Sequence, residues 1–174
     1  MISKMSISVC VADHPSSLGC NDYIHDSNLP NTLDPISSVV IRMASIPSNV
    51  IEKMNAEGTV KVLVTADKSG QPHAIVCGTI MSPAPDKMVV GEVLMKKSAS
   101  NLAENPKASF MIAAGMEAWE IDVKNPVRID GGADLDKMNE ALAPIHLHAN
   151  ALWIFDVDAV YDQGANPNAG KKIA

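Results

Sequence analysis

The chain has 174 residues, a net charge of −6 and a pI of about 5.2. This length suits one domain with a tail, and the acidic balance argues against a dedicated nucleic-acid-binding protein, which would carry a basic stripe. Hydrophobic residues make up 47% of the chain but aromatic residues only 3%, so small aliphatic side chains and methionines must fill the core.

Composition divides the chain into three parts. Residues 1–45 are predicted to be an N-terminal extension, either poorly ordered or lying as an arm over the core, because Asn, Asp, Ser and Pro crowd positions 13–38 with little periodicity. From Pro47 the pattern becomes orderly, which places a domain at residues 46–163. Residues 164–174 are expected to be a C-terminal tail.

Hydrophobic periodicity and cap residues predict the elements of this domain. Ser48 and Ser98 are expected as helix N-caps, and Pro106 is expected to close the second helix. Alternating apolar residues predict strands, of which residues 88–94 are apolar apart from Glu92. The expected order is a helix at 48–57, strands at 59–66, 72–81 and 88–94, a helix at 98–105, strands at 107–114 and 117–131 (interrupted at 125–126), a helix at 133–144, and a strand at 151–162.

Six short strands without regular βαβ alternation predict a mainly β fold. We expect a six-stranded antiparallel barrel with short flanking helices. No GxGxxG motif follows a predicted strand, which disfavours a Rossmann sheet.

One short stretch combines positive charge with the predicted start of a helix. Lys96 and Lys97 follow the third strand, and Ser98 opens the helix, where free N–H groups and the positive end of the helix dipole meet. Such a turn can hold a phosphate group without a glycine-rich loop. From the residues alone, a solvated lysine pair is the more common outcome.

The order of elements and this stretch together resemble the FMN-binding split-barrel family related to pyridoxamine 5′-phosphate oxidase. The similarity runs from Asn55 to Gln163, through EGTVKVLVTADKSGQPHAIVCGTI, VVGEVLMKKSASNLAENPKASFMIA and WIFDVDAVYDQ. Its most typical element is the basic and hydroxyl stretch before Asn-Leu-x-x-Asn-Pro, residues 96–106.

The resemblance implies a six-stranded split barrel that forms a homodimer with FMN near the subunit interface. The start of the second helix would contact the FMN phosphate, and the second strand would face the isoalloxazine ring. A glycine on that strand would let the planar ring approach the backbone. The predicted FMN-binding residues are Lys96, Lys97 and Ser98 at the phosphate, Asn101 supporting their turn, Val76, Cys77 and Gly78 at the ring, and Val93 and Leu94 nearby.

The chain departs from true pyridoxamine phosphate oxidases on the second strand. Those enzymes carry an Arg and a Lys there, whereas residues 74–80 have the sequence AIVCGTI. We therefore expect one of the smaller flavin-binding members: an FMN-dependent oxidoreductase that transfers electrons or uses NAD(P)H, or a protein electron donor, to reduce a small acceptor. The alternatives are a non-catalytic electron-carrier module and a split barrel that binds another ligand such as haem. No catalytic residue is predicted.

The remaining polar residues support simpler interpretations. His146 and His148 stand two apart with no third ligand nearby, so no metal site is expected. Three cysteines without CxxC spacing favour a reduced, cytoplasmic protein, and Cys77 is interpreted first as a small buried hydrophobic residue. No apolar run is long enough to cross a bilayer, so no membrane association is expected.

Overall fold

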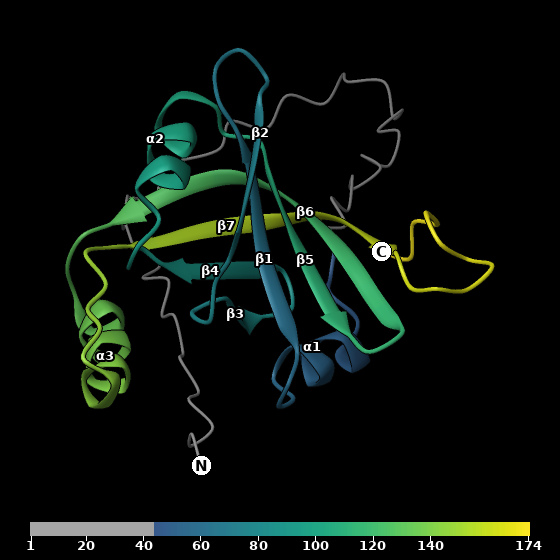
Figure 1. The fold of residues 1–174 in the computed structure, drawn as a ribbon, viewed down its shortest axis with the longest axis horizontal. Helices are drawn as coiled ribbons and strands as arrows, with labels where there is room; N and C mark the ends of the chain where they lie inside the picture. The colour runs from purple at the N-terminus through teal and green to yellow at the C-terminus, as the bar shows by residue number, and fades with distance from the viewer. Residues whose placement is uncertain (1–43) are drawn as a thin grey trace, which may run out of the picture. The chain divides into compact units, whose positions relative to one another are not determined.

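One antiparallel β-sheet dominates residues 44–174, the part of the chain that this computed structural model describes (Figure 1). Its strands are β1 (Val60–Ala66), β2 (Pro72–Val76), β3 (Met81–Ala84), β4 (Lys87–Gly91), β5 (Ala108–Ala114), β6 (Glu117–Ile129) and β7 (Leu152–Asp162). The helices are α1 (Ser48–Met54), α2 (Lys96–Glu104) and α3 (Ala133–Leu142), and a 3₁₀ turn (Ala143–Ile145) follows α3. The predicted extension lies outside the described residues except for its last two.

The sheet has the order β2-β1-β5-β6-β7-β4-β3, with every pair antiparallel. Its two edge strands, β2 and β3, follow each other in the chain and are joined by only residues 77–80. A flat sheet cannot satisfy this connection, so the sheet curls until its edges approach each other. Lys61 Nζ on β1 donates a hydrogen bond of 2.7 Å to the carbonyl of Ile80 and so ties β1 to this connection.

Seven strands therefore replace the six that the sequence predicts. The expected strand at residues 72–81 ends at Val76, and a turn at Gly78 and Thr79 separates it from β3. The two prolines of residues 82–87 favour a turn, but β3 is an edge strand, where a missing N–H group costs no ladder hydrogen bond. The predicted turn is therefore wrong over most of its length.

Strand alternation places the main hydrophobic core on the inner face of the curled sheet. Helices α1 and α2 pack on this face through Val50, Met54 and Leu102. Phe110 on β5 and Phe155 on β7 are both 0% exposed and form an edge-to-face pair, with ring centroids 5.3 Å apart. Because the chain contains only two phenylalanines, this pair places both of them at the centre of the core.

Helix α3 lies on the other face of the sheet, against β4 and β7 (Figure 1). A second, smaller cluster forms there. Its buried members are Val89, Leu135, Met138, Leu142, Ala149 and Leu152. The predicted helical face of Leu135, Met138 and Leu142 is confirmed. Among residues 44–174, no helix is both long and apolar enough to span a membrane.

Strand β6 continues through its predicted interruption. Asn125 has a positive φ of 52°, and the register with β7 shifts between Lys124 and Val127, as expected for a bulge. The Asn125 amide donates a 2.8 Å hydrogen bond to Asp156 Oδ2 on β7, which holds the two strands together across the bulge. The strand ends at Ile129.

The C-terminal segment returns to β7. The N–H of Val160 donates to the carbonyl of Ala174 (2.9 Å), and Tyr161 forms an antiparallel bridge with Lys172. Residues 164–174, predicted as a tail, thus end beside the last strand.

Candidate functional site

The lysine pair lies at the first two positions of α2. The helix begins at Lys96, and its N-cap is Met95, which makes no side-chain capping bond. Ser98, predicted as the N-cap, is the third helical residue, so the predicted start is two residues late. Among the described residues, none accepts a hydrogen bond from the backbone N–H groups of Lys96, Lys97 or Ser98. The helix therefore presents three free donors together with the positive end of its dipole.

The side chains at this helix start differ in exposure. Lys96 and Lys97 are exposed, and neither forms an ion pair with another residue of 44–174. Ser98 is 0% exposed, and its Oγ has no hydrogen-bond partner among the described residues. A buried hydroxyl without a partner is costly, which marks this position as one where a further acceptor would be favourable.

The hairpin turn after β1 lies close to the lysine pair. Asp67 accepts hydrogen bonds from the hydroxyl of Ser69 (2.6 Å) and from the N–H of Gln71 (3.0 Å). These bonds, with the nearby charge of Lys97, hold the pKa of Asp67 below its ordinary value. Lys97 therefore reaches the vicinity of this turn without forming an ion pair there.

Asn101 holds α2 against the sheet. Its Nδ2 donates a 3.0 Å hydrogen bond to Thr65 Oγ1 at the end of β1, and both side chains are buried, at 4% and 1% exposure. The contact ties α2 to the end of β1, while the expected role of Asn101 beside a bound phosphate stays a prediction. It fixes the second turn of the helix and thereby the direction of the first.

Replacing Asn101 with alanine is expected to lower the free energy of unfolding by about 1–3 kcal/mol, because the Thr65 hydroxyl then loses its buried partner. Urea unfolding would measure this loss. The double variant Asn101→Leu, Thr65→Val removes both polar groups and is expected to be less destabilised than Asn101→Ala. Equal losses in the two variants would contradict a hydrogen-bonded role for Asn101.

The predicted ring-binding residues lie at the end of β2 and just beyond it. Val76 is 73% exposed, and a side chain added at Gly78 would meet nothing within 4 Å. Cys77 packs partly into the main core, and burial raises the pKa of its thiol, which keeps it protonated at neutral pH. An exposed valine and an open glycine leave room for a planar group on this surface.

Val93 and Leu94 do not lie on a strand. Strand β4 ends at Gly91, and both residues belong to the connection to α2. Val93 packs partly against the α3 cluster, whereas Leu94 is 83% exposed. The predicted strand 88–94 is thus wrong at its C-terminal end. Glu92 still exchanges backbone hydrogen bonds with Ala151 and Asn150, but the N–H of Val93 turns back to the carbonyl of Gly91 (3.0 Å).

Glu92, Arg128 and Trp153 form a hydrogen-bonded group that the sequence did not reveal. Arg128 donates to both carboxylate oxygens of Glu92, from Nε at 2.9 Å and from Nη2 at 3.3 Å. Trp153 Nε1 donates to Glu92 Oε2 at 2.8 Å. A glutamate within an apolar run was the available signal, but its partners on β6 and β7 depend on strand register.

Comparisons with known proteins show which fold the chain has. No family model matches the sequence, and no curated protein is similar enough in sequence to count as a relative. Solved structures do match. An FMN-binding protein from Syntrophomonas wolfei has 16% identity and a TM-score of 0.59, over 68% of this chain and 88% of its own.

Two further matching structures are named for different ligands. A candidate pyridoxamine 5′-phosphate oxidase from Lactobacillus delbrueckii has 13% identity and a TM-score of 0.57, over 70% of this chain and 97% of its own. HutZ, the haem storage protein of Vibrio cholerae, has 16% identity and a TM-score of 0.51, over 69% and 96%. This chain has the split-barrel fold. The predicted fold class is confirmed, with seven strands rather than six, while identities this low leave the ligand open.

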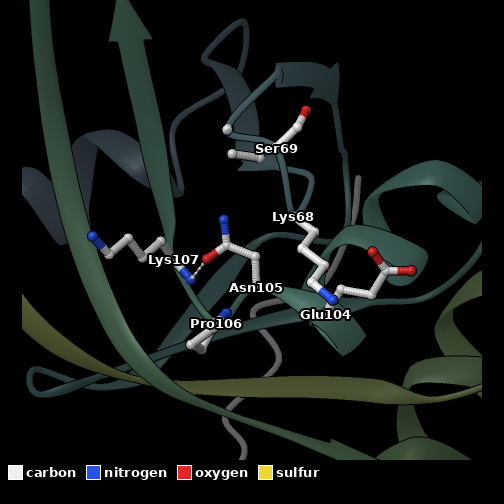
Figure 2. A pocket seen from close by; sticks show the side chains of 8 residues that line it. Lys68, Ser69, Glu104, Asn105, Pro106 and Lys107 are labelled. Carbon is white, nitrogen blue, oxygen red and sulfur yellow. Dashed lines mark hydrogen bonds between the residues drawn. The ribbon is translucent and has the colours of Figure 1, made fainter.

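Two hollows on the described part of this split barrel are lined by neither Lys96 nor Lys97. One, of about 510 Å³, lies between the β1–β2 turn and the C-terminal end of α2. Figure 2 shows Lys68 reaching toward Glu104 in it, and Asn105 accepting a 3.1 Å hydrogen bond from the N–H of Lys107. The second, of about 620 Å³, continues from Pro106 along β1, β5 and β6. Neither is lined by a predicted FMN-binding residue, and both carry mixed charge.

The bonded state of Glu92 predicts a pH dependence of stability. Hydrogen bonds from Arg128, and then from Trp153, hold the pKa of Glu92 below its ordinary value of 4.5. A carboxylate with a lowered folded pKa stabilises the protein above its unfolded pKa, and this contribution is lost as pH falls through the folded pKa.

Glu92→Gln is therefore expected to be less stable than the parent at pH 7, with a gap that narrows below about pH 4.5. Urea unfolding of both proteins between pH 7 and pH 3 would measure it. Taking the difference between the two proteins cancels the carboxylates that they share. A gap that stays constant across this range would contradict the proposed ionised state.

Proposed function

We propose that this split barrel binds FMN at the start of α2 and serves as a redox protein. The observation that carries the proposal is the buried hydroxyl of Ser98. It has no hydrogen-bond partner among residues 44–174, and it lies in the same helical turn as two lysines that form no ion pair within that range. A phosphate group offers acceptors to all of these donors at once. The fold shared with an FMN-binding protein supports the choice of ligand.

The residues at the helix start fit a phosphate by their chemistry. The ammonium groups of Lys96 and Lys97 would neutralise its charge, and the Ser98 hydroxyl and free N–H groups would donate hydrogen bonds to its oxygens. Asn101 would keep this turn in place through Thr65. When bound, FMN supplies hydride and single-electron transfer through its isoalloxazine ring, and the protein supplies binding and orientation.

The ring would lie against the exposed apolar surface at the end of β2. Val76 and the open side of Gly78 offer it a flat contact, and Leu94 precedes the lysine pair by only one residue, Met95. Covering these residues would remove apolar surface from water, which favours binding. Val93 contributes less in this arrangement, because it already packs against the α3 cluster.

A homodimer belongs to the same proposal. The outer face of β2, β1 and β5 carries small apolar side chains, among them Val60, Val62, Val76, Met111 and Ala113. Among the described helices, α1 and α2 pack on the opposite face and α3 packs against β4 and β7. A second copy on this uncovered face would lie beside the end of β2, where the ring is proposed to bind.

Titration of the purified protein with FMN, followed by its fluorescence and visible spectrum, tests the proposal. Saturable binding with a flavin spectrum is expected, and no binding of FMN would overturn it. Haem is the second candidate, favoured by the fold shared with HutZ. A Soret band on adding haem, without FMN binding, would select it, although His146 and His148 are exposed and His73 is only half-buried.

Turnover separates an enzyme from an electron carrier. If the protein is an oxidoreductase, NAD(P)H with a dye acceptor is expected to give steady oxidation that depends on bound FMN. A carrier would instead be reduced only by a protein donor. A cytoplasmic location, where NAD(P)H is available and the Cys77 thiol stays reduced, is part of this proposal.

Ser98→Ala provides a test in which stability and affinity move differently. Because the Ser98 hydroxyl has no partner to lose within the described part of the chain, the variant is expected to be as stable as the parent or more stable. Its FMN affinity is expected to fall about fivefold, the size of one lost hydrogen bond of about 1 kcal/mol. Thermal unfolding without ligand and FMN titration would measure the two effects. A loss of stability without a loss of affinity would remove Ser98 from the phosphate site.

A further inference from the structure

Glu92 stands at the point where β4 leaves the sheet toward α2. Its carboxylate is bonded to Arg128 on β6 and to Trp153 on β7, so one side chain joins three strands. Trp153 is 5% exposed and belongs to the main core, whereas the Arg128 side chain is 39% exposed. The group therefore lies at the rim of the barrel interior, with one partner buried and one reaching solvent.

The backbone of Glu92 is fixed as firmly as its side chain. Its N–H donates to the carbonyl of Ala151 and its own carbonyl accepts from the N–H of Asn150, each at 2.8 Å. Only three residues, 93–95, then separate it from the first residue of α2. At the other side of the lysine pair, Asn101 is bonded to Thr65. The lysine pair thus lies between two anchored points.

We infer that Glu92 and Arg128 are positioning residues for the anion site at the start of α2. A short connection held at both ends keeps the first helical turn in one orientation, so that its donors converge before a ligand arrives. Preorganisation of this kind raises affinity by lowering the ordering cost of binding. The inference rests on the proposed function, because it assigns a role in the same site.

The geometry favours positioning over a contribution to stability alone. Ion pairs with a partner as exposed as Arg128 add little stability. The ion pair of Lys87 with Asp156 lies at the other end of β4 and joins β4 to β7, whereas Arg128 lies on β6. It is therefore a control that removes a cation from an ion pair made by β4 but leaves the connection to α2 untouched.

The experiment compares Arg128→Leu with Lys87→Leu in the full-length protein. Arg128→Leu is expected to raise the Kd for FMN about tenfold, the size of a lost coupling between neighbouring groups. The Kd for riboflavin, which lacks the phosphate but would contact Leu94 in the same connection, is expected to rise less than the Kd for FMN. Arg128→Lys is expected to recover part of the loss, because a lysine restores the charge without the two-pronged contact.

A second measurement needs no ligand. Hydrogen exchange at the amides of Glu92, Val93 and Ala99, each bonded within the protein, is expected to be faster in Arg128→Leu than in the parent and unchanged in Lys87→Leu. Unchanged exchange in Arg128→Leu, or equal FMN losses in the two variants, would overturn the inference. If the parent protein binds no FMN, the proposed function fails and exchange alone decides whether Arg128 holds this segment.

Discussion

Replacing Lys96 and Lys97 together with alanine is expected to raise the Kd for FMN about 100-fold, counting about tenfold for each charge-assisted bond to the phosphate. Both ammonium groups are exposed and lie at the first two helical positions, so their loss leaves the core and the helix intact. The folded variant should therefore show weaker binding with an unchanged melting temperature. Titration by flavin fluorescence would measure the change.

Two controls separate a phosphate contact from a general effect of charge. Riboflavin is expected to bind the parent and the double variant equally, because it carries no phosphate. The variant Lys68→Ala, Lys107→Ala removes the same charge from the hollow at the far end of α2. It should retain FMN binding. The proposed contact would be contradicted if the double variant lost as much affinity for riboflavin as for FMN. It would also be contradicted if the control variant lost as much affinity for FMN as the double variant.

Phe110→Ala is expected to lower the free energy of unfolding by about 3–5 kcal/mol. Its ring is 0% exposed and meets Phe155 edge to face at the centre of the core. This loss is a large fraction of the roughly 5–15 kcal/mol that stabilises a typical domain. Urea unfolding followed by circular dichroism would measure it.

A matched control lies on the surface of the same sheet. Val76→Ala removes apolar atoms from a side chain that is 73% exposed and is expected to change stability by less than about 0.5 kcal/mol. A Phe110→Ala protein with stability near that of the parent would mean that the two rings do not form the centre of the core.

Strands can be predicted from the sequence where apolar and polar residues alternate strongly. The prediction fails where a residue that disfavours strands, such as proline, lies at the edge of the sheet. Val60, Val62 and Val64 alternate with inward residues, and β1 forms as expected. Residues 81–84 contain a proline, which local propensity assigns to a turn, yet the sheet accepts them because β3 is an edge. No local signal tells an edge strand from a turn, since the order of strands in the sheet decides it.

The candidate site could also be predicted only in part. Lys96, Lys97 and Asn101 follow one another along a helix, so their proximity can be predicted from spacing alone. Glu92 and Arg128 are 36 residues apart and meet only because β7 lies between β4 and β6. The pairing of β4, β7 and β6 cannot be predicted from the local sequence. The helix start was placed two residues late, because Ser98 has the chemistry of a cap but is buried without capping the helix.

The place of β7 in the sheet has a consequence for the order of folding. It follows the other six strands in the chain yet lies between β6 and β4, so it is the bridge between β2-β1-β5-β6 and the β4-β3 hairpin. Until β7 has been synthesised, β4 and β6 each present an unpaired edge. Completion of the barrel must therefore wait for the most distant contacts in the chain, and ribosome-bound fragments that end before Leu152 should be the species most prone to aggregate.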